Sequence, residues 1–238
     1  MERLDKLLSS TGRWSRREAK ELLRQGRVTV EGRAVLRGEE KVPEGAAVLV
    51  DGAPLTLERM VYLMLHKPAG VLSATEDRRQ KTVLDLLPDH LKRVGLFPVG
   101  RLDKDTEGLL LLTNDGDLAH RLLSPRKHVD KAYYARLDGP VGEEDIAAFA
   151  GGMVLEDGTR CLPAGLEPVG EDGCLVTLRE GKFHQVKRML AARGRMVRYL
   201  KRLSMGPLRL DEALKPGQWR PLNGDEMEQL GIPGEKGE

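Results

Sequence analysis

The segment GRLDKDTEGLLLLTNDG, residues 100–116, constrains the fold of this chain more than any other stretch. Its apolar run, Leu109–Leu112, is typical of a strand that is buried in a core. A polar loop precedes this run and contains Arg101, Asp103 and Asp105. We therefore expect two strands joined by a short loop that holds Asp103 rigidly at the end of a buried strand. On these residues alone, a loop-capping role for Asp103, in which it accepts backbone N–H bonds, is the slightly favoured alternative.

Strand and helix patterns alternate from about residue 60 onward. Strand patterns outnumber helical ones, and hairpin-type links are common, so we predict an α+β fold with a mainly antiparallel mixed sheet. The strand patterns cover residues 61–67, 95–102, 108–113, 131–138 and 173–180, and the helical patterns cover 82–91, 116–124, 143–153 and 183–194.

The first part of the chain has the pattern of a small separate module. MERLDKLLSSTG predicts a short helix, and Ser15 with Glu18 predicts a capping box at the start of a second helix. RVTVEGRAVL alternates around Glu31-Gly32, which indicates a hairpin. A boundary near Leu55–Met60 divides the chain into two predicted domains, 1–58 and 59–238.

Basic residues are segregated along a chain whose net charge is only +2. Residues 1–33 contain nine Lys/Arg and five Asp/Glu, and residues 181–202 contain eight Lys/Arg and no acid. Such segregation indicates basic faces for a polyanion, although charged helices are often simply solvated. The residues that we expect to form the first basic face are Arg3, Lys6, Arg16, Arg17, Lys20, Arg24 and Arg27.

Composition disfavours several classes of protein. The chain has two cysteines, Cys161 and Cys174, with no CxxC spacing and no clustered histidines, which argues against a zinc site and against a disulfide scaffold. The N-terminus has no apolar signal core, and the longest apolar run is far below the roughly 18 residues of a membrane helix. We expect a soluble, cytoplasmic protein that binds no membrane.

Two further segments carry side chains suited to chemistry. In EGKFHQVKRML, Phe183, Val186 and Leu190 recur at helical spacing and should face the core, which places Lys187 on an adjoining face. A lysine there could pair with a partly buried carboxylate. In KAYYARL, adjacent tyrosines face opposite sides of a strand, so Tyr133 could stack on a base while its neighbour packs in the sheet.

Taken together, these stretches resemble the pseudouridine synthases of the RsuA type, which modify ribosomal RNA, over nearly the whole chain. The N-terminal RLDKLLSSTGRWSRREAKELLRQGRVTVEGR is similar to the RNA-binding module named after small-subunit ribosomal protein S-four. The second part contains LHKPAGVLSAT, GRLDKDTEGLLLLTNDGDLAHRLLSP, KAYYARL and EGKFHQVKRMLAARG in that order.

The resemblance implies a role for each matching residue. Asp103 of GRLD would be the catalytic carboxylate, and Tyr133 of KAY would lie against the target base. Lys187 would pair with the aspartate, with Arg188 the less favoured choice, and Arg101 would lie near the active site and contact RNA. Because converting uridine to pseudouridine requires neither redox change nor hydrolysis, we expect no cofactor and no metal.

The motifs HQVKRM and KPAGVLSAT look most like those of the small-subunit enzymes. We therefore expect one uridine of 16S ribosomal RNA as the target, in a partly assembled small-subunit particle, and a monomeric enzyme. Three alternatives remain at this point: a large-subunit or transfer-RNA target, a non-catalytic assembly protein that uses only its N-terminal module, and a glycoside hydrolase. The last would need a second carboxylate about 5–10 Å from Asp103, for which Asp105 is the obvious candidate.

Overall fold

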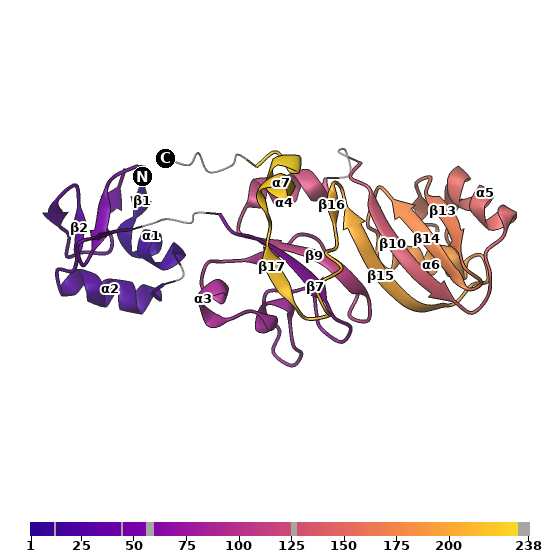
Figure 1. Cartoon of the computed structure of the whole chain (residues 1–238), viewed down its shortest axis with the longest axis horizontal. Coiled ribbons are helices and arrows are strands. Elements are labelled where there is room, and N and C mark those ends of the chain that lie inside the picture. The colour runs from indigo at the N-terminus through magenta and orange to yellow at the C-terminus, as the bar shows by residue number, and fades with distance from the viewer. Residues whose placement is uncertain (12, 44, 56–59, 125–127, 233–238) are drawn as a thin grey trace. The chain divides into compact units, whose positions relative to one another are not determined.

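A computed structural model describes residues 1–11, 13–43, 45–55, 60–124 and 128–232. Backbone proximity divides the chain into two compact units (Figure 1): Met1–Val61 with Leu84–Phe97, and Tyr62–Val83 with Pro98–Glu238. The predicted boundary between residues 58 and 59 lies outside the described residues and stays a prediction.

The N-terminal module folds as its sequence pattern predicts. The capping box is present, since Ser15 Oγ accepts from the Glu18 amide at 3.3 Å and the Ser15 amide donates to Glu18 Oε2 at 2.6 Å. The hairpin turns at Glu31 and Gly32, both at positive φ. Leucines of both helices pack on valines of the strands. The elements are β1 (Glu2–Arg3), α1 (Leu4–Ser10), α2 (Arg16–Arg24), β2 (Val28–Val30), β3 (Arg33–Ala34), β4 (Lys41–Val42), β5 (Val48–Val50) and β6 (Ala53–Pro54).

A large mixed sheet organises the second part of the chain. Within the described residues its strands follow the order β13-β14-β10-β15-β9-β7-β17, with β16 beside β15 and β8 beside β9. Along this order, β15 and β9 are the only neighbouring strands of the described residues that pair in parallel, and the other pairs are antiparallel. The predicted α+β fold with a mainly antiparallel sheet is therefore confirmed. The strands are β7 (Tyr62–Lys67), β8 (Phe97–Pro98), β9 (Glu107–Thr113), β10 (Lys131–Leu137), β13 (Gly165–Val169), β14 (Gly173–Leu178), β15 (Val197–Met205), β16 (Leu208–Arg209) and β17 (Trp219–Pro221).

Helices and a small hairpin complete the fold. Phe149 of α5 and Met189 and Leu190 of α6 are fully buried in one apolar core with residues of β10 and β14. The remaining elements are η1 (Val83–Leu86), α3 (Asp89–Lys92), α4 (Gly116–Leu123), α5 (Glu143–Gly151), β11 (Met153–Val154), β12 (Arg160–Cys161), α6 (Gln185–Ala191) and α7 (Gly224–Gln229).

The parallel pairing of β9 with β15 depends on a glycine. Gly108 has φ +109°, and a Cβ there would lie 2.2 Å from the backbone oxygen of Arg202. The Arg202 side chain is only 2 % exposed and donates from Nε to the Leu109 carbonyl at 2.8 Å. One of the eight basic residues of 181–202 is therefore part of the interior, and the expectation of a basic surface is wrong at this position.

The sequence patterns were wrong at three other places. Phe183, expected in the core, is 74 % exposed, because α6 begins only at Gln185. The helical pattern 82–91 is divided into η1 and α3 at Pro88, which precedes α3 in an extended conformation. Of the strand pattern 95–102, only Phe97–Pro98 pairs as β8.

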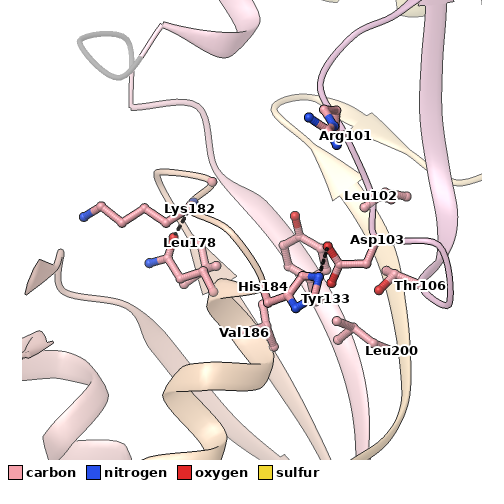
Figure 2. Close-up of a pocket in the computed structure, with 12 residues that line it drawn as sticks. Arg101, Leu102, Asp103, Thr106, Tyr133, Leu178, Lys182, His184, Val186 and Leu200 are labelled. Carbon is pink, nitrogen blue, oxygen red and sulfur yellow. Dashed lines mark hydrogen bonds and ion pairs between the residues drawn. The ribbon is translucent and has the colours of Figure 1, made fainter. Parts of the chain in front are cut away.

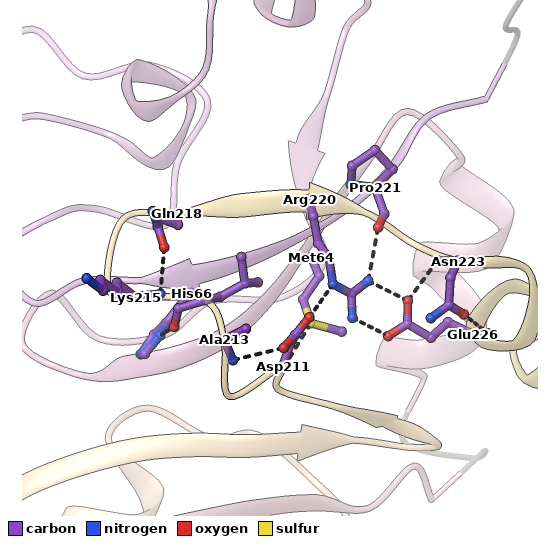
Figure 3. A network of polar contacts seen from close by, with 11 residues as sticks. Met64, His66, Asp211, Ala213, Lys215, Gln218, Arg220, Pro221, Asn223 and Glu226 are labelled. Carbon is purple, nitrogen blue, oxygen red and sulfur yellow. Dashed lines mark hydrogen bonds and ion pairs between the residues drawn. The ribbon is translucent and has the colours of Figure 1, made fainter.

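The C-terminal strand β17 pairs with the edge of β7, and a partly buried polar network lies beside it (Figure 3). Arg220 donates to Asp211 Oδ2 at 2.6 Å and, through both terminal nitrogens, to Glu226 at 2.7 and 2.8 Å. These hydrogen bonds raise the pKa of Arg220 and lower the pKa of both carboxyl groups. Strand β17 covers the edge of β7, the strand that ends at Lys67, and Lys67 contributes to the site described next.

Candidate active site

Hydrogen bonds to its main chain hold the loop that carries Asp103. Ser73 Oγ donates to the Leu102 carbonyl at 2.9 Å and lies 3.0 Å from the Leu102 amide, which donates to it. The Thr106 amide donates to the Asp103 carbonyl at 3.1 Å and closes a tight turn. Asp103 is thus placed immediately before the buried strand β9, as the sequence predicts.

A buried ammonium group fastens the same loop. Lys67, at the end of β7, is fully buried and donates to the carbonyls of Pro68, Lys104 and Thr106 at 3.0, 3.2 and 2.9 Å. Burial lowers the pKa of the Lys67 ammonium to about 8. Sequence analysis missed this residue, although a lysine that ends an otherwise apolar strand is a recognisable signal.

Helix α6 presents a lysine to the carboxylate, as predicted. Lys187 Nζ lies 3.2 Å from Asp103 Oδ2 and 2.5 Å from Asp105 Oδ1. The hydrogen bond from Lys187 lowers the pKa of the Asp105 carboxyl group. Asp103 and Lys187 are each about one quarter exposed, whereas Asp105 is 74 % exposed. Asp103 is therefore the carboxylate that faces the more enclosed side of this cluster.

A pocket opens beside Asp103 and brings together three of the predicted residues, whereas Lys187 contacts Asp103 without lining the pocket (Figure 2). Arg101, Asp103 and Tyr133 line it, together with residues from the start of α6 and from β15. Tyr133 is only 8 % exposed, whereas Tyr134 faces the other side of β10 and packs on Tyr199 with ring centroids 6.4 Å apart. The predicted division of the two tyrosines between opposite faces is confirmed.

Among the lining residues that were not predicted as site residues, His184 is the one that contacts Asp103 through its side chain. His184 precedes α6 in the left-handed conformation, with φ 49° and ψ 33°. Its Nε2 atom lies 3.5 Å from Asp103 Oδ1, a contact that Figure 2 shows as a dashed line. Arg188, the less favoured partner for Asp103, instead pairs with Asp157 at 2.5 Å and does not line the pocket.

The predicted basic residues of the N-terminal module divide into two groups. Four are paired with nearby acids: Arg3 with Asp5, Lys6 with Glu2, Arg24 with Glu21 and Arg27 with Asp51. Arg16, Arg17 and Lys20 are exposed, form no ion pair with any described residue and line a shallow groove along α2. These three are the residues of α2 that are most available to a phosphate backbone.

The described part of the chain offers neither a metal site nor a disulfide. It contains no group of three or more His, Cys, Asp or Glu placed to hold a metal ion. Cys161 and Cys174 are both free and buried. Among the same residues, no helix has the length and apolar character needed to cross a membrane.

The chemistry available to the pocket follows from its parts. A carboxylate is held beside a cation in a partly enclosed site, next to a buried aromatic ring and the apolar strand β9. Such a carboxylate can act as a nucleophile or stabilise positive charge that develops on a bound molecule. The neighbouring ring offers a flat apolar surface for a planar group.

Comparison with known proteins assigns the family. The model of the RNA pseudouridylate synthase family matches residues 61–192, and that of the S4 domain matches residues 2–48. The chain belongs to the RNA pseudouridylate synthase family and is an RNA pseudouridine synthase with an N-terminal RNA-binding S4 domain. This assignment leaves no support for the glycoside hydrolase or for an assembly protein that uses its N-terminal module alone.

Similar proteins cover almost the whole chain. A Bacillus subtilis protein described as an uncharacterized RNA pseudouridine synthase is 49 % identical over 97 % of this chain and 99 % of its own length. The ribosomal small subunit pseudouridine synthase A of Pseudomonas aeruginosa is 42 % identical over 94 % of this chain and 98 % of its own. A crystal structure of a pseudouridylate synthase is 37 % identical, with a TM-score of 0.69 over 97 % of this chain and all of that one.

Proposed function

We propose that this protein converts one uridine of small-subunit ribosomal RNA to pseudouridine, with Asp103 as the catalytic carboxylate. The observation that carries the assignment of Asp103 is its position 3.2 Å from Lys187 in the pocket that Tyr133 also lines. The small-subunit target is supported by relatives named ribosomal small subunit pseudouridine synthase A, which are 40–42 % identical over nearly their full lengths.

The reaction is an isomerisation in which all atoms of the base are retained. The bond between N1 and the ribose C1′ breaks, the freed uracil turns, and a bond forms between C5 and C1′. N1 gains a proton and C5 loses one. Asp103 would act at the ribose, either by attacking it or by stabilising the positive charge that develops there. Lys187 would hold the carboxylate in place through their ion pair.

Tyr133 would receive the base. A uridine in a folded RNA must leave its stack to reach the pocket, at a cost of a few kcal/mol. Stacking on an aromatic side chain returns about 1–3 kcal/mol per base. Because Tyr133 is buried beside Asp103, its ring is already oriented before the RNA binds, so little entropy is lost on contact.

Basic residues outside the carboxylate cluster would hold the RNA backbone. Arg101 is exposed at the pocket and is suited to a phosphate next to the target. In the N-terminal module, Arg16, Arg17 and Lys20 are free to contact a separate RNA helix. We further propose that the enzyme is a monomer, acts in the cytoplasm on a partly assembled small-subunit particle, and has its domain boundary between residues 58 and 59.

The test is pseudouridine mapping by mass spectrometry on small- and large-subunit ribosomal RNA incubated with wild-type protein, Asp103→Asn or Asp105→Asn. Asp105→Asn is a matched control, because both carboxylates lie on one loop and both contact Lys187. We expect one new pseudouridine in small-subunit RNA with wild type and with Asp105→Asn, and none with Asp103→Asn. Turnover by Asp103→Asn would refute its role, and a site in large-subunit RNA would refute the target.

Repeating the mapping on naked RNA and on partly assembled particles tests the form of the substrate. We expect faster modification of the particles. Equal rates on naked RNA would show that assembly is not required.

A further inference from the structure

An aromatic side chain is exposed next to His184, one of the residues that line the pocket. Phe183 is 74 % exposed, whereas Phe149 is fully buried and Phe97 is partly buried. The chain has only three phenylalanines. Burying such a ring would stabilise the fold by about 1.5–3 kcal/mol, and this stabilisation is largely forgone here. A structural role in the core therefore does not account for Phe183.

The exposed ring lies against the neighbouring imidazole. The Phe183 and His184 rings are stacked, with centroids 3.8 Å apart and planes inclined by 18°. His184 in turn lines the pocket and contacts Asp103 through Nε2. One face of the Phe183 ring is thus covered by His184, and its large exposed fraction leaves the other face open.

The surroundings of this ring suit a nucleic acid. Phe183 lies between Lys182 and the basic residues of α6, in the segment 181–202 that contains no acidic residue. The Arg188 guanidinium, which also pairs with Asp157, donates to the Phe183 carbonyl at 3.4 Å and so lies beside the backbone of this residue. Aromatic rings beside basic groups are the combination with which proteins bind unpaired bases.

We propose that the Phe183–His184 stack is a second base-binding site, which takes the unpaired base adjoining the target uridine in the same RNA strand. This inference rests on the proposed function. The flipped uridine enters the pocket at Asp103, and its neighbour stacks on the open face of Phe183 as a third ring. This contact compensates part of the stacking that the neighbouring base loses when the uridine leaves the helix.

The position of the stack makes it a binding site and not a part of the chemistry. His184 lies between Phe183 and the carboxylate, so a base on the outer face of Phe183 is one ring further from the reacting atoms. Loss of the aromatic face should therefore weaken binding and leave the chemical step nearly unchanged. Stacking worth about 1–3 kcal/mol per base corresponds to a 5- to 150-fold change in affinity.

The experiment compares Phe183→Leu, which keeps an apolar side chain but removes the ring, with Phe183→Tyr, which keeps the ring. Val154→Ala is the control, because Val154 is also exposed, at 63 %, and does not line the pocket. RNA binding and pseudouridine formation are measured separately on a small-subunit RNA transcript. We expect KM and Kd to rise about 5- to 150-fold for Phe183→Leu only, with kcat changed less than about threefold.

A second arm uses RNA in which the nucleotide on either side of the mapped uridine is abasic. For one of the two abasic RNAs, the affinity for wild-type protein should be as low as the affinity of intact RNA for Phe183→Leu. The same abasic RNA should bind Phe183→Leu with no further loss of affinity, because the stacking contact is already absent. Unchanged KM and Kd in Phe183→Leu would overturn the inference, and so would losses that add up when Phe183→Leu is combined with either abasic RNA. In both cases the proposed function would stand as long as the protein still forms pseudouridine. Binding without any pseudouridine would instead count against the proposed function alone.

Discussion

Lys67 provides the most quantitative test of how the Asp103 loop is built. Replacing it by methionine keeps the apolar stem but removes the ammonium that donates to Pro68, Lys104 and Thr106. Three carbonyls then lose a donor in a buried site, where each unsatisfied group costs about 1–3 kcal/mol. We expect Lys67→Met to be less stable than wild type and to lose up to about 100-fold in kcat, because the loop that places Asp103 loosens.

The pH dependence follows from the depressed pKa of Lys67. The folded-state pKa is about 8, against an ordinary value of 10.5, so the unfolded chain binds more protons between these two pH values. Stability of the wild type must therefore rise with pH across this window, and must be independent of this group below pH 8 and above pH 10.5. From pH 7.5 to 9.5 the expected gain is about 2 kcal/mol.

The assay is urea unfolding of both proteins at pH 7.5, 8.5 and 9.5. Other titrating groups, such as the partly buried Tyr62 and Tyr199 whose pKa values are raised to about 12, are common to both proteins and cancel in the difference. The deficit of Lys67→Met should grow by about 2 kcal/mol over this range. Parallel stability curves would show that Lys67 does not titrate there, and the account of a strongly desolvated ammonium would be wrong.

Three further predictions concern the site and the RNA-binding surface. Gly108→Ala should lower the free energy of unfolding by at least about 2 kcal/mol, because its Cβ would lie 2.2 Å from the backbone oxygen of the neighbouring strand at a φ of +109°. This loss would appear as a lower urea midpoint, and an unchanged midpoint would contradict it. Lys187→Met should abolish most pseudouridine formation, measured by mass spectrometry, whereas Asp105→Asn should keep activity within about threefold, since its exposed ion pair is worth at most about 1 kcal/mol. Equal losses in both variants would refute the distinction between the two carboxylates. Arg17→Ala should reduce the slope of log affinity for RNA against log salt by about 0.7–0.9, whereas Lys6→Ala, whose charge is paired with Glu2, should change it less; equal slopes would argue against the α2 surface.

Local sequence signals were sufficient where the interactions are local. The capping box at Ser15 and the hairpin at Glu31-Gly32 each depend on residues within four positions of one another, and both are present. The alternation of KAYYARL likewise placed Tyr133 and Tyr134 on opposite faces of β10. The motif resemblance indicated the family, the fold and the position of Asp103 beside a buried strand.

The pattern failed where a single backbone angle interrupts a period. Helical spacing from Phe183 to Leu190 predicts one apolar face, but His184 adopts a left-handed conformation and the helix begins after it. Phe183 consequently points away from the core and lies against His184. Phe183, which its helical spacing predicted to lie in the core, is therefore an exposed ring next to His184.

The sequence by itself indicated the class of enzyme, the mainly antiparallel α+β fold and three of the residues that line the pocket, Arg101, Asp103 and Tyr133. Only the tertiary structure decided which charges are buried and which are free. Arg202 and Lys67 have the same chemistry as the surface cations, yet the sheet encloses both. The physical reason is that burial of a charge depends on carbonyl groups supplied by distant segments, such as the 104–106 loop for Lys67. No local sequence period contains that information.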